Sequence, residues 1–411
     1  MNLSKFIANR IAFNRQKSFS RFIIRLSTVA TAISVAVMII TISLVNGFQE
    51  TVSQKIFSFW GHIRVEYKQG ERSSTAEEIS IVKNDTLLNA IKKNENVKSI
   101  HPFATRYAIL KTNEEVEGVM VKGIESSYDF KNIKQFLKEG RWLQLNYSNY
   151  SKEIIISSHF SKLLKLKLND AILIYFIRPD GSLRPDKLTI VGIYKTGIEM
   201  YDNSFALSDL RLIQKLNGWD SSKIGGYEIF LDDYSQMGKT SEELYNLDEF
   251  PSAWNTKTIY NLYPNIFDWL NMQNVTRNVL IVFMLLVAII NLITCILILV
   301  LERIRMVGVL KALGLSDWIV QKIFLRHVLI IASTGIFCGL ILGLGLLFLQ
   351  QQTGFITLQE EAYYMNTAAV KIVWWQIAII CISTFAICFA VLLIPSFLVK
   401  RINPVKSIQF R

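Results

Sequence analysis

Four long stretches of the chain are almost purely apolar. They cover residues 26–48, 278–301, 328–349 and 372–399, and none of them contains Asp, Glu, Lys or Arg. A helix of about 20 apolar residues is long enough to cross ~30 Å of hydrocarbon, so each stretch predicts a membrane-spanning helix. The first stretch follows a basic arm and has no small-residue cleavage site, which indicates a retained helix rather than a signal peptide.

Between the first two stretches the pattern changes to short alternating runs. Alternation of apolar and polar positions predicts strands over residues 62–67, 107–111, 116–123, 153–156, 171–177, 188–194 and 227–231. A short helix is predicted over 158–166, and Asp-Gly between two prolines predicts a turn over 178–185. From residue 259 the pattern is helical again and leads into the second apolar stretch, although Pro264 allows a break there.

The expected fold class is therefore an α-helical membrane protein with four transmembrane helices and a large mixed α/β extracytoplasmic domain inserted between helices 1 and 2. The chain has 411 residues, of which 51% are hydrophobic, and this is enough for both a membrane region and a separate domain core. Two asparagines, Asn46 and Asn291, lie in apolar stretches, where we expect them to form hydrogen bonds between helices.

Lysine and arginine are concentrated in three of the remaining segments. Residues 1–25, 302–326 and 400–411 carry almost the whole basic excess, whereas residues 48–271 are close to neutral, and the chain has a net charge of +12. Because cytoplasmic segments of membrane proteins are rich in Lys and Arg, these segments, and with them both termini, are expected in the cytoplasm. Topology explains the basic balance, so no nucleic-acid partner is expected.

The N-terminal arm has a pattern of its own. Leu3, Phe6, Ile7 and Ile11 recur at helical spacing beside basic residues. This pattern predicts an amphipathic helix on the inner membrane surface, and a disordered basic anchor is the alternative.

Residues that could carry out catalysis or bind a metal are scattered. The cysteines all lie in apolar stretches, at Cys295, Cys338, Cys381 and Cys388, so the polar region has no disulfide framework. The four histidines are far apart and form no HExxH motif. We therefore expect no catalytic residue, no metal site and no cofactor, and the chain is not expected to be an enzyme.

The loop after the second apolar stretch carries the most informative motif. It reads ERIRMVGVLKALGL over residues 302–315, with Arg305, Val309, Ala312 and Leu313 at helical spacing and Gly314 as a helix end. Such a short amphipathic helix lies either on the lipid surface or in the groove of a soluble partner, and the periodicity does not decide between them.

This motif resembles the coupling-helix region of FtsX-like ABC transporter permeases of the MacB type. The resemblance rests on Glu302-Arg303, Gly308, Leu310-Lys311-Ala312 and Gly314. The order of one helix, a large outer domain and three helices is also similar to that family, as are Asn46-Gly47-Phe48 in the first helix and Pro395-Ser396 in the last. Within the family, the domain size and the run over 191–210 most resemble the lipoprotein-releasing (LolC/LolE-type) permeases.

The resemblance implies a permease subunit that works in a dimer with an identical or related protomer and with a dimeric cytoplasmic ABC ATPase. Such permeases extract lipoproteins from the bacterial inner membrane and pass them to a periplasmic carrier for transfer to the outer membrane. The chain then divides into a cytoplasmic arm (1–25), transmembrane helix 1 (26–48), a periplasmic MacB-like core domain (49–271), transmembrane helix 2 (272–301), a cytoplasmic loop with the coupling helix (302–326), transmembrane helix 3 (327–349), a periplasmic loop (350–371), transmembrane helix 4 (372–399) and a cytoplasmic tail (400–411).

The resemblance also implies roles for individual residues. The ATPase would be coupled through Glu302, Arg303, Arg305, Val309, Leu310, Ala312, Leu313 and Gly314. Acyl chains would lie near Asn46, Gly47, Phe48, Phe267 and Leu270, and the carrier would bind near Pro179, Leu183 and Pro185. Many members of the family have an acid where this chain has Met306. The turn over 178–185 is shorter than the carrier-binding hairpin of one of the paired permeases, so an ordinary solvated hairpin is the alternative there.

Two other functions fit the same pattern. The nearer one is a MacB-type permease for efflux or mechanotransmission. The other is a membrane-anchored sensor without an ATPase, and it predicts that no ATPase binds the loop over 302–326.

Overall fold

The computed structural model describes residues 19–68, 79–112, 115–128, 131–145, 150–177 and 183–396. The chain forms two compact units. The first, here called the helical unit, comprises residues 1–50, 269–357 and 367–411, and the second, the outer domain, comprises residues 51–268 and 358–366. Residues 1–18 of the predicted arm, the tail over 400–411 and Pro179 lie outside the described residues.

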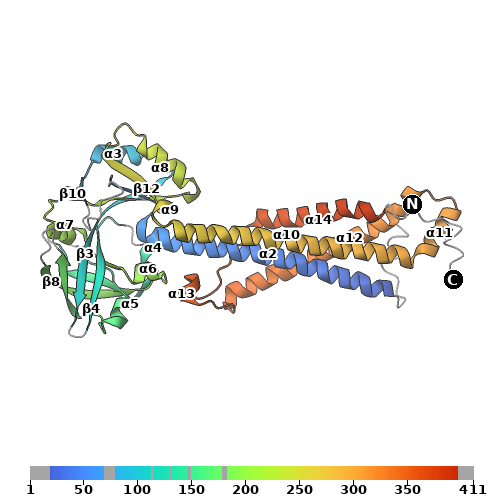
Figure 1. Cartoon of the computed structure of the whole chain (residues 1–411), viewed down its shortest axis with the longest axis horizontal. Coiled ribbons are helices and arrows are strands. Elements are labelled where there is room, and N and C mark those ends of the chain that lie inside the picture. Colours follow the sequence, from blue (N-terminus) through green and yellow to red (C-terminus); the bar gives the residue numbers. More distant parts are fainter. Residues whose placement is uncertain are drawn as a thin grey trace. The chain divides into compact units, whose positions relative to one another are not determined.

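Long helices make up the helical unit (Figure 1). They are α2 (Phe19–Trp60), α10 (Pro264–Glu302), α12 (Asp317–Thr353) and α14 (Trp374–Ser396), with the short α11 (Ile304–Ala312) between α10 and α12. Among the described residues, three helices are long and apolar enough to cross a membrane, namely Phe22–Trp60, Pro264–Glu302 and Asp317–Thr353, and Trp374–Ala390 is a shorter apolar helix. The unit boundaries after residues 50 and 268 fall inside α2 and α10, so both helices contribute to both units.

Apolar packing holds these helices together. One buried cluster draws residues from all five helices, and a second joins α2, α12 and α14. Gly335, Gly339 and Gly343 lie four residues apart on α12, and a Cβ on Gly339 would collide with the carbonyl group of Ala32 on α2. Small residues at this spacing allow two membrane helices to approach closely.

Hydrogen bonds between helices support the packing. Asn291 of α10 donates from Nδ2 to the carbonyl oxygen of Ser27 on α2 at 3.0 Å. Asn46 of α2 donates from Nδ2 to Oε1 of Gln376 on α14 at 2.5 Å. The interhelical role predicted for both asparagines is confirmed.

The outer domain is built on a ten-stranded sheet. Its strands are β1 (Ile63–Tyr67), β3 (Val97–Lys111), β4 (Val116–Ile124), β5 (Leu137–Gly140), β6 (Glu153–Ser157), β7 (Ala171–Ile177), β8 (Leu183–Tyr194), β9 (Phe205–Asp209), β11 (Gly226–Leu231) and β12 (Trp254–Thr258). Because β7 pairs with both β3 and β8, the strands β3, β4, β9, β6, β8 and β7 close into a ring. From β3 the sheet continues through β11 and β1 to β12, and from β8 to β5.

Short elements complete the outer domain (Figure 1). A separate two-stranded sheet joins β2 (Ile81–Val82) to β10 (Lys223–Ile224). The helices are α3 (Asp85–Ile91), α4 (Lys131–Lys134), α5 (Ser158–Leu163), α6 (Glu199–Asp202), α7 (Leu210–Asn217), α8 (Met237–Tyr245), α9 (Ile259–Leu262) and α13 (Glu360–Tyr363).

The predicted mixed α/β domain is confirmed, and the differences have physical reasons. All seven predicted strands are present. β8 begins at Leu183, so the end of the predicted turn belongs to a strand. The sequence pattern does not predict β9, because all five of its residues are buried and no alternation marks it. The helix expected from residue 259 is interrupted at Tyr263, and α10 begins at Pro264, where proline suits the first helical turn.

The last turn of α2 is buried inside the outer domain. Phe59 and Trp60 are 1% and 2% exposed, and their rings pack against aromatic side chains of β3, β8, β9 and α6. Gly61 ends the helix with φ +70° and donates its N–H to the carbonyl oxygen of Phe57 at 2.7 Å. Because water does not reach a buried helix end, the last carbonyl groups of α2 need partners from the protein itself.

Lys122 of β4 is one of these partners. Its ammonium group donates to the carbonyl oxygen of Phe59, lies 4.4 Å from the centroid of the Trp60 ring, and forms a 2.6 Å ion pair with Glu228 of β11. Both side chains of the pair are fully buried. Burial lowers the pKa of Lys122 and raises the pKa of Glu228, and their mutual attraction opposes both shifts. A cation at a helix C-terminus is also stabilised by the helix dipole.

We expect the outer domain to lose much of its stability when one member of this pair is removed. Glu228→Gln leaves the Lys122 charge buried without a counter-charge, which costs about 3–5 kcal/mol. Urea unfolding of the full chain in detergent, followed by tryptophan fluorescence, measures the loss as a smaller free energy of unfolding.

Two further variants sharpen this experiment. Lys122→Met/Glu228→Leu removes both charges and should recover most of the lost stability. Glu125→Gln is the matched control, because its ion pair with Lys83 is about one-third exposed and should contribute less than about 1 kcal/mol. Equal losses in Glu228→Gln and Glu125→Gln would contradict the role given to the buried pair.

Candidate functional site

The loop between α10 and α12 folds into α11, which Arg303 separates from α10. Gly314 ends α11 with φ +87°. Its N–H bonds to the carbonyl oxygen of Lys311 at 3.0 Å, and the N–H of Leu315 bonds to that of Leu310 at 3.1 Å. These two bonds form a Schellman helix end, for which glycine is the favoured residue. The predicted helix that stops at Gly314 is therefore present.

The two faces of α11 have different environments. The inner face packs against the buried cluster of the helical unit through Met306, Val307, Leu310 and Leu315. The exposed face carries Arg305, Val309, Ala312 and Leu313, and the Leu313 side chain is 74% exposed. Among the predicted ATPase-coupling residues, Leu310 thus supports the packing of the helices, while Val309 and Leu313 present an apolar surface.

The exposed surface extends onto the start of α12. Trp318 is 61% exposed there, and the helical periodicity of 302–315 gave no signal for it. An ion pair of 2.9 Å between Lys311 and Asp317 joins the end of α11 to the first turn of α12. We call Arg305, Val309, Ala312, Leu313 and Trp318 the α11 surface.

The predicted acyl-chain residues are divided between the units. Phe267 belongs to the outer domain, and the other four belong to the helical unit. Gly47 has no room for a side chain, because the backbone before α14 lies against it. Phe48 packs edge-on against Trp269, with 5.1 Å between ring centroids. Phe267 and Leu270 are both buried, and the Phe267 ring packs against Phe57 and Tyr260 of its own unit.

Exposed apolar side chains form stripes on α2 and α10. They recur every three or four residues, at Phe22, Leu26, Val29 and Ile33 on α2 and at Met272, Val275, Val279, Val282 and Leu286 on α10. This spacing places each set on one side of its helix. The stripes are apolar surface of the kind that faces lipid, acyl chains or another membrane helix.

The predicted carrier-binding residues Leu183 and Pro185 lie on the outer face of the strand ring. Register places Pro185 of β8 beside Tyr175 of β7, which in turn lies beside Ile109 of β3. Leu183 lies beside Ile177 in the same way. Neighbouring side chains on one face of a sheet form a continuous surface, so these apolar residues make up a patch across three strands.

The patch is open to solvent. Tyr107, Ile177 and Leu183 are between 38% and 52% exposed, and nothing lies within 4 Å of a Cβ built on Gly118, the neighbour of Ile109 on β4. We call the surface formed by Tyr107, Ile109, Leu173, Tyr175, Ile177, Leu183 and Pro185 the ring patch.

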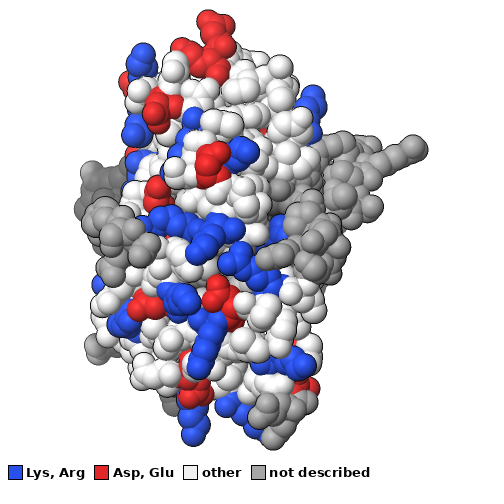
Figure 2. All heavy atoms as spheres, turned by 90° about the vertical axis from the view of Figure 1, so that its left-hand side faces the viewer, with Lys and Arg blue, Asp and Glu red and all other residues white. Residues whose placement is uncertain are grey.

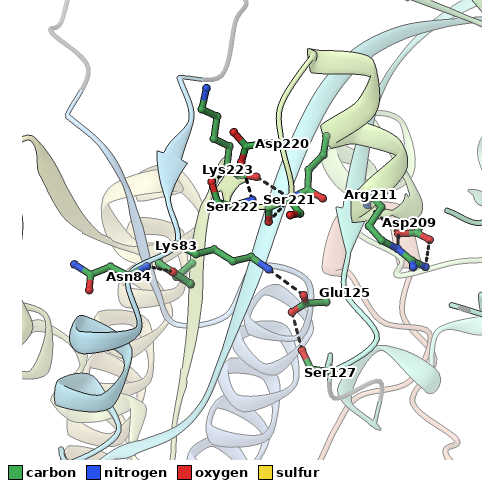
Figure 3. Close-up of polar contacts among 12 residues, drawn as sticks. Lys83, Asn84, Glu125, Ser127, Asp209, Arg211, Asp220, Ser221, Ser222 and Lys223 are labelled. Atoms are coloured by element: carbon green, nitrogen blue, oxygen red, sulfur yellow. Dashed lines mark hydrogen bonds and ion pairs between the residues drawn. The ribbon is translucent and has the colours of Figure 1, made fainter. Parts of the chain in front are cut away.

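Charges elsewhere on the outer domain are mixed. Figure 2 shows one face on which basic and acidic groups are interspersed, with a band of Lys and Arg across its middle. In Figure 3, Lys83 pairs with Glu125 at 3.1 Å and Arg211 pairs with Asp209 at 2.8 Å. Asp209 also accepts the N–H of Arg211 and thereby caps α7. Paired charges of this kind agree with the near-neutral composition of the region.

Residues 358–366, which lie between α12 and α14 in the sequence, are part of the outer domain. Glu360 of α13 forms an ion pair with Lys195, just after β8. The ammonium group of Lys55 on α2 donates to the carbonyl oxygens of Thr196 at 2.7 Å and Tyr364 at 2.6 Å. Lys55, Lys195 and Glu360 thus fasten this segment to the domain, and we call them the clasp.

The pKa values of the clasp follow from its surroundings. Burial lowers the pKa of Lys55, against the attraction of Glu360. Burial acts to raise the pKa of Glu360, but the hydrogen bond and charge of Lys195 outweigh it and hold that pKa below its usual range. A cavity of about 580 Å³ adjoins the clasp, and its lining mixes the basic side chains of Lys162 and Lys195 with acidic ones.

His62 has a structural role in the outer domain. Nδ1 of His62 accepts the N–H of Leu231 at 2.9 Å, and burial lowers the pKa of His62 to about 4, so the ring is neutral. Across the described ranges, no group of three His, Cys, Asp or Glu side chains could hold a metal ion.

Comparison with known proteins connects both halves of the chain to transporters. Residues 26–245 match the family described as the MacB-like periplasmic core domain, and residues 278–404 match the FtsX-like permease C-terminal family. The chain is 22% identical over 426 residues to the lipoprotein-releasing system transmembrane protein LolE of Haemophilus influenzae, with 100% of each chain covered. It is also 22% identical to the corresponding protein LolC of Neisseria meningitidis, with 96% of each chain covered.

Among solved structures, a transporter domain matches about half of the chain. The periplasmic region of MacB from Actinobacillus actinomycetemcomitans matches with 15% identity and a TM-score of 0.35, covering 50% of this chain and 91% of that one.

We expect the clasp to depend on the sign of its charges. Glu360→Lys places like charges at this contact and should free residues 360–366, so that their amide hydrogens exchange about fivefold or more faster, as the loss of an ion pair worth roughly 1 kcal/mol implies. Hydrogen–deuterium exchange of the full chain in detergent measures this change.

The reciprocal variant Lys195→Glu/Glu360→Lys restores opposite charges and should restore slow exchange. Glu125→Lys is the control, since it alters the net charge as Glu360→Lys does but acts on the ion pair with Lys83, elsewhere in the domain. Unchanged protection of 360–366 in Glu360→Lys would show that the clasp does not hold this segment.

Proposed function

This chain belongs to the family of permeases that combine a MacB-like periplasmic core domain with an FtsX-like C-terminal region, and from this we propose that it is the permease subunit of an ATP-driven transporter that extracts lipoproteins from the bacterial inner membrane. The observation that carries the proposal is full-length similarity to the lipoprotein-releasing proteins LolE and LolC. The exposed α11 surface supports it, since a permease needs a contact for a separate motor.

In this proposal the chain crosses the membrane four times, with α2, α10, α12 and α14. Both termini and α11 lie in the cytoplasm and the outer domain lies in the periplasm, in agreement with the basic residues of 1–25, 302–326 and 400–411. The length and composition of three of the helices support this topology, and α14 is apolar over its described length.

Removal of a lipoprotein from the bilayer requires energy from outside the permease. Each acyl methylene group contributes ~0.8 kcal/mol to membrane binding, so a single long acyl chain already requires on the order of 10 kcal/mol. We assign ATP hydrolysis to a dimeric cytoplasmic ATPase that binds the α11 surface. α2 and α10 would then transmit the motion, because each is one uninterrupted helix shared by both units.

A second permease protomer, identical or related, would complete the membrane cavity. The apolar stripes of α2 and α10 supply surface for it and for the acyl chains of the cargo. The ring patch supplies an apolar surface for a periplasmic lipoprotein carrier, with Leu183 and Pro185 at its edge.

We expect Val309→Glu/Leu313→Glu to prevent the ATPase from copurifying with the chain. Both side chains are exposed, so the substitutions place two charges in the proposed contact without disturbing the buried cluster behind α11. Loss of more than about 90% of the copurified ATPase is expected, since unpaired charges in an interface cost several kcal/mol. Leu163→Glu, at an exposed leucine of the outer domain, is the matched control and should retain the ATPase. A complex that stays intact in Val309→Glu/Leu313→Glu would refute the coupling role and favour an anchored sensor.

Depletion of the chain should cause lipoproteins to accumulate in the inner membrane. Fractionation of the two membranes, with detection of acylated proteins, measures their distribution. Normal sorting after depletion would be evidence for a MacB-type efflux or mechanotransmission permease instead.

Complementation then tests the ring patch in the same assay. A chain with Ile177→Glu/Leu183→Glu should bind the ATPase but fail to restore transfer to the outer membrane, because charges interrupt the apolar surface. Val82→Glu alters an equally exposed apolar residue on β2, outside the ring, and should complement fully. Full complementation by both variants would remove the ring patch from the mechanism.

A further inference from the structure

We propose that Arg277, Asn278, Asn46 and Gln376 form a binding site for the phosphate group of a phospholipid. The site lies in the helical unit, where α10, α2 and α14 meet through polar side chains. The inference relies on the proposed membrane topology but is independent of which cargo the transporter carries.

The hydrogen bonds of Arg277 within the described part of the chain go to neutral groups. Its Nε and Nη2 atoms each donate to Oδ1 of Asn278 at 3.2 Å, and Nη1 donates to Oδ1 of Asn46 at 3.5 Å. Asn46 in turn donates to Gln376, so one chain of hydrogen bonds joins the three helices. Among the described residues, no carboxylate forms an ion pair with Arg277.

The neighbouring cation shows the contrast. Lys371, which precedes α14, forms an ion pair of 2.8 Å with Glu50 of α2. Its charge is therefore neutralised within the chain, whereas no carboxylate of the described residues neutralises Arg277. An arginine in a largely apolar helix is costly without a counter-charge and marks a functional site.

The geometry of the guanidinium group suits a phosphate. The group has five N–H donors in one plane, and the three hydrogen bonds described use one hydrogen each on Nε, Nη1 and Nη2. One hydrogen remains on each of Nη1 and Nη2. Guanidinium N–H donors on two nitrogen atoms bind two oxygen atoms of a phosphate at once.

Two observations place the site at the level of lipid headgroups. The apolar run over 278–301 begins directly after Arg277 and, at 1.5 Å per residue, spans about 36 Å, which exceeds the ~30 Å of hydrocarbon. Trp374 and Trp375, next to Gln376, are 68% and 63% exposed. Tryptophan is enriched at membrane–water interfaces, so α10 and α14 both indicate the outer interface.

A phospholipid satisfies this site better than other ligands with oxygen acceptors. The ester and amide carbonyl groups of an acylated protein accept hydrogen bonds but bring no negative charge. A phosphodiester brings both the charge and the paired oxygens. Leu280, exposed three residues after Arg277 and therefore on the same side of α10, offers apolar contact for the chains of the same lipid, which free phosphate lacks.

The test compares lipid retention by the full chain and its variants. Each protein is purified in detergent, incubated with phosphatidylglycerol, and examined by native mass spectrometry. Arg277→Gln should lower the bound fraction of phosphatidylglycerol by about tenfold, and Arg277→Lys, which keeps the charge but not the paired donors, should lower it less. Lys371→Gln is the matched control and should retain the lipid, because its cation is already neutralised by Glu50.

Two further ligands identify what the site recognises. Diacylglycerol has the same chains without the phosphate and should bind at least tenfold more weakly to the unaltered chain. Inorganic phosphate at millimolar concentration should not displace phosphatidylglycerol. Retention of phosphatidylglycerol by Arg277→Gln at the level of the unaltered chain, equal binding of diacylglycerol, or displacement by inorganic phosphate would each overturn the inference.

Failure here can be distinguished from failure of the proposed function. If Arg277→Gln keeps its lipid while the unaltered chain copurifies with an ATPase and sorts lipoproteins, only the phosphate site is refuted. If lipid retention depends on Arg277 but lipoproteins sort normally after depletion of the chain, the phosphate site is supported and the proposed lipoprotein release is refuted.

Discussion

The last carbonyl groups of α2 are buried and need hydrogen-bond donors from the protein itself. One donor is Lys122, whose side chain is also buried and bonds to the carbonyl oxygen of Phe59. Lys122 can hold this position only because Glu228 neutralises it from β11, and β11 is fixed in register between β1 and β3. The central strands, the turn at Gly61 and the aromatic packing around Phe59 thus meet at one ion pair, and loss of either charge alone would disturb all three. If the end of α2 moved and separated Lys122 from Glu228, a charge would remain unpaired in apolar surroundings. Few other positions of the helix end are therefore compatible with this sheet.

The way in which the chain enters and leaves the outer domain suggests the part that the domain plays in the proposed mechanism. The domain contains the end of α2, the start of α10 and the segment over 358–366, so residues from two separate parts of the sequence, 51–268 and 358–366, belong to one folded body. α2 and α10 enter it as continuous helices, whereas α11 is separated from α10 by the break at Arg303. Two continuous helices that lead into the domain, and a break between α10 and α11 at the other end of α10, suit a domain that is moved by a motor bound elsewhere.

Much of this could be predicted from the sequence, because the relevant signals are local. The length of the apolar stretches predicts the long helices, the alternation of apolar and polar residues predicts seven of the strands, and Gly314 predicts the end of α11. The signals that fail are those that depend on partners far apart in the chain. Nothing in the sequence near Lys122 indicates Glu228, and nothing near Lys195 indicates Glu360. Periodicity also identifies α11 as amphipathic without showing that Leu310 faces the buried cluster and Leu313 faces outward.

Arg277 illustrates how a charge count gains meaning from geometry. The positive-inside pattern explains the basic residues of the cytoplasmic segments, but Arg277 lies at the opposite end of its apolar run and belongs to none of them. Only the hydrogen bonds show that it has neutral partners. A transporter that draws acyl chains out of a bilayer is surrounded by phospholipids with similar chains. The length of the acyl chains does not distinguish a phospholipid from a lipoprotein. The phosphate group does, because the acyl chains of a lipoprotein are attached to protein and not to a phosphate headgroup. Arg277, a cation at the headgroup level of α10, would therefore bind the phospholipid through its phosphate, the group that the lipoprotein lacks.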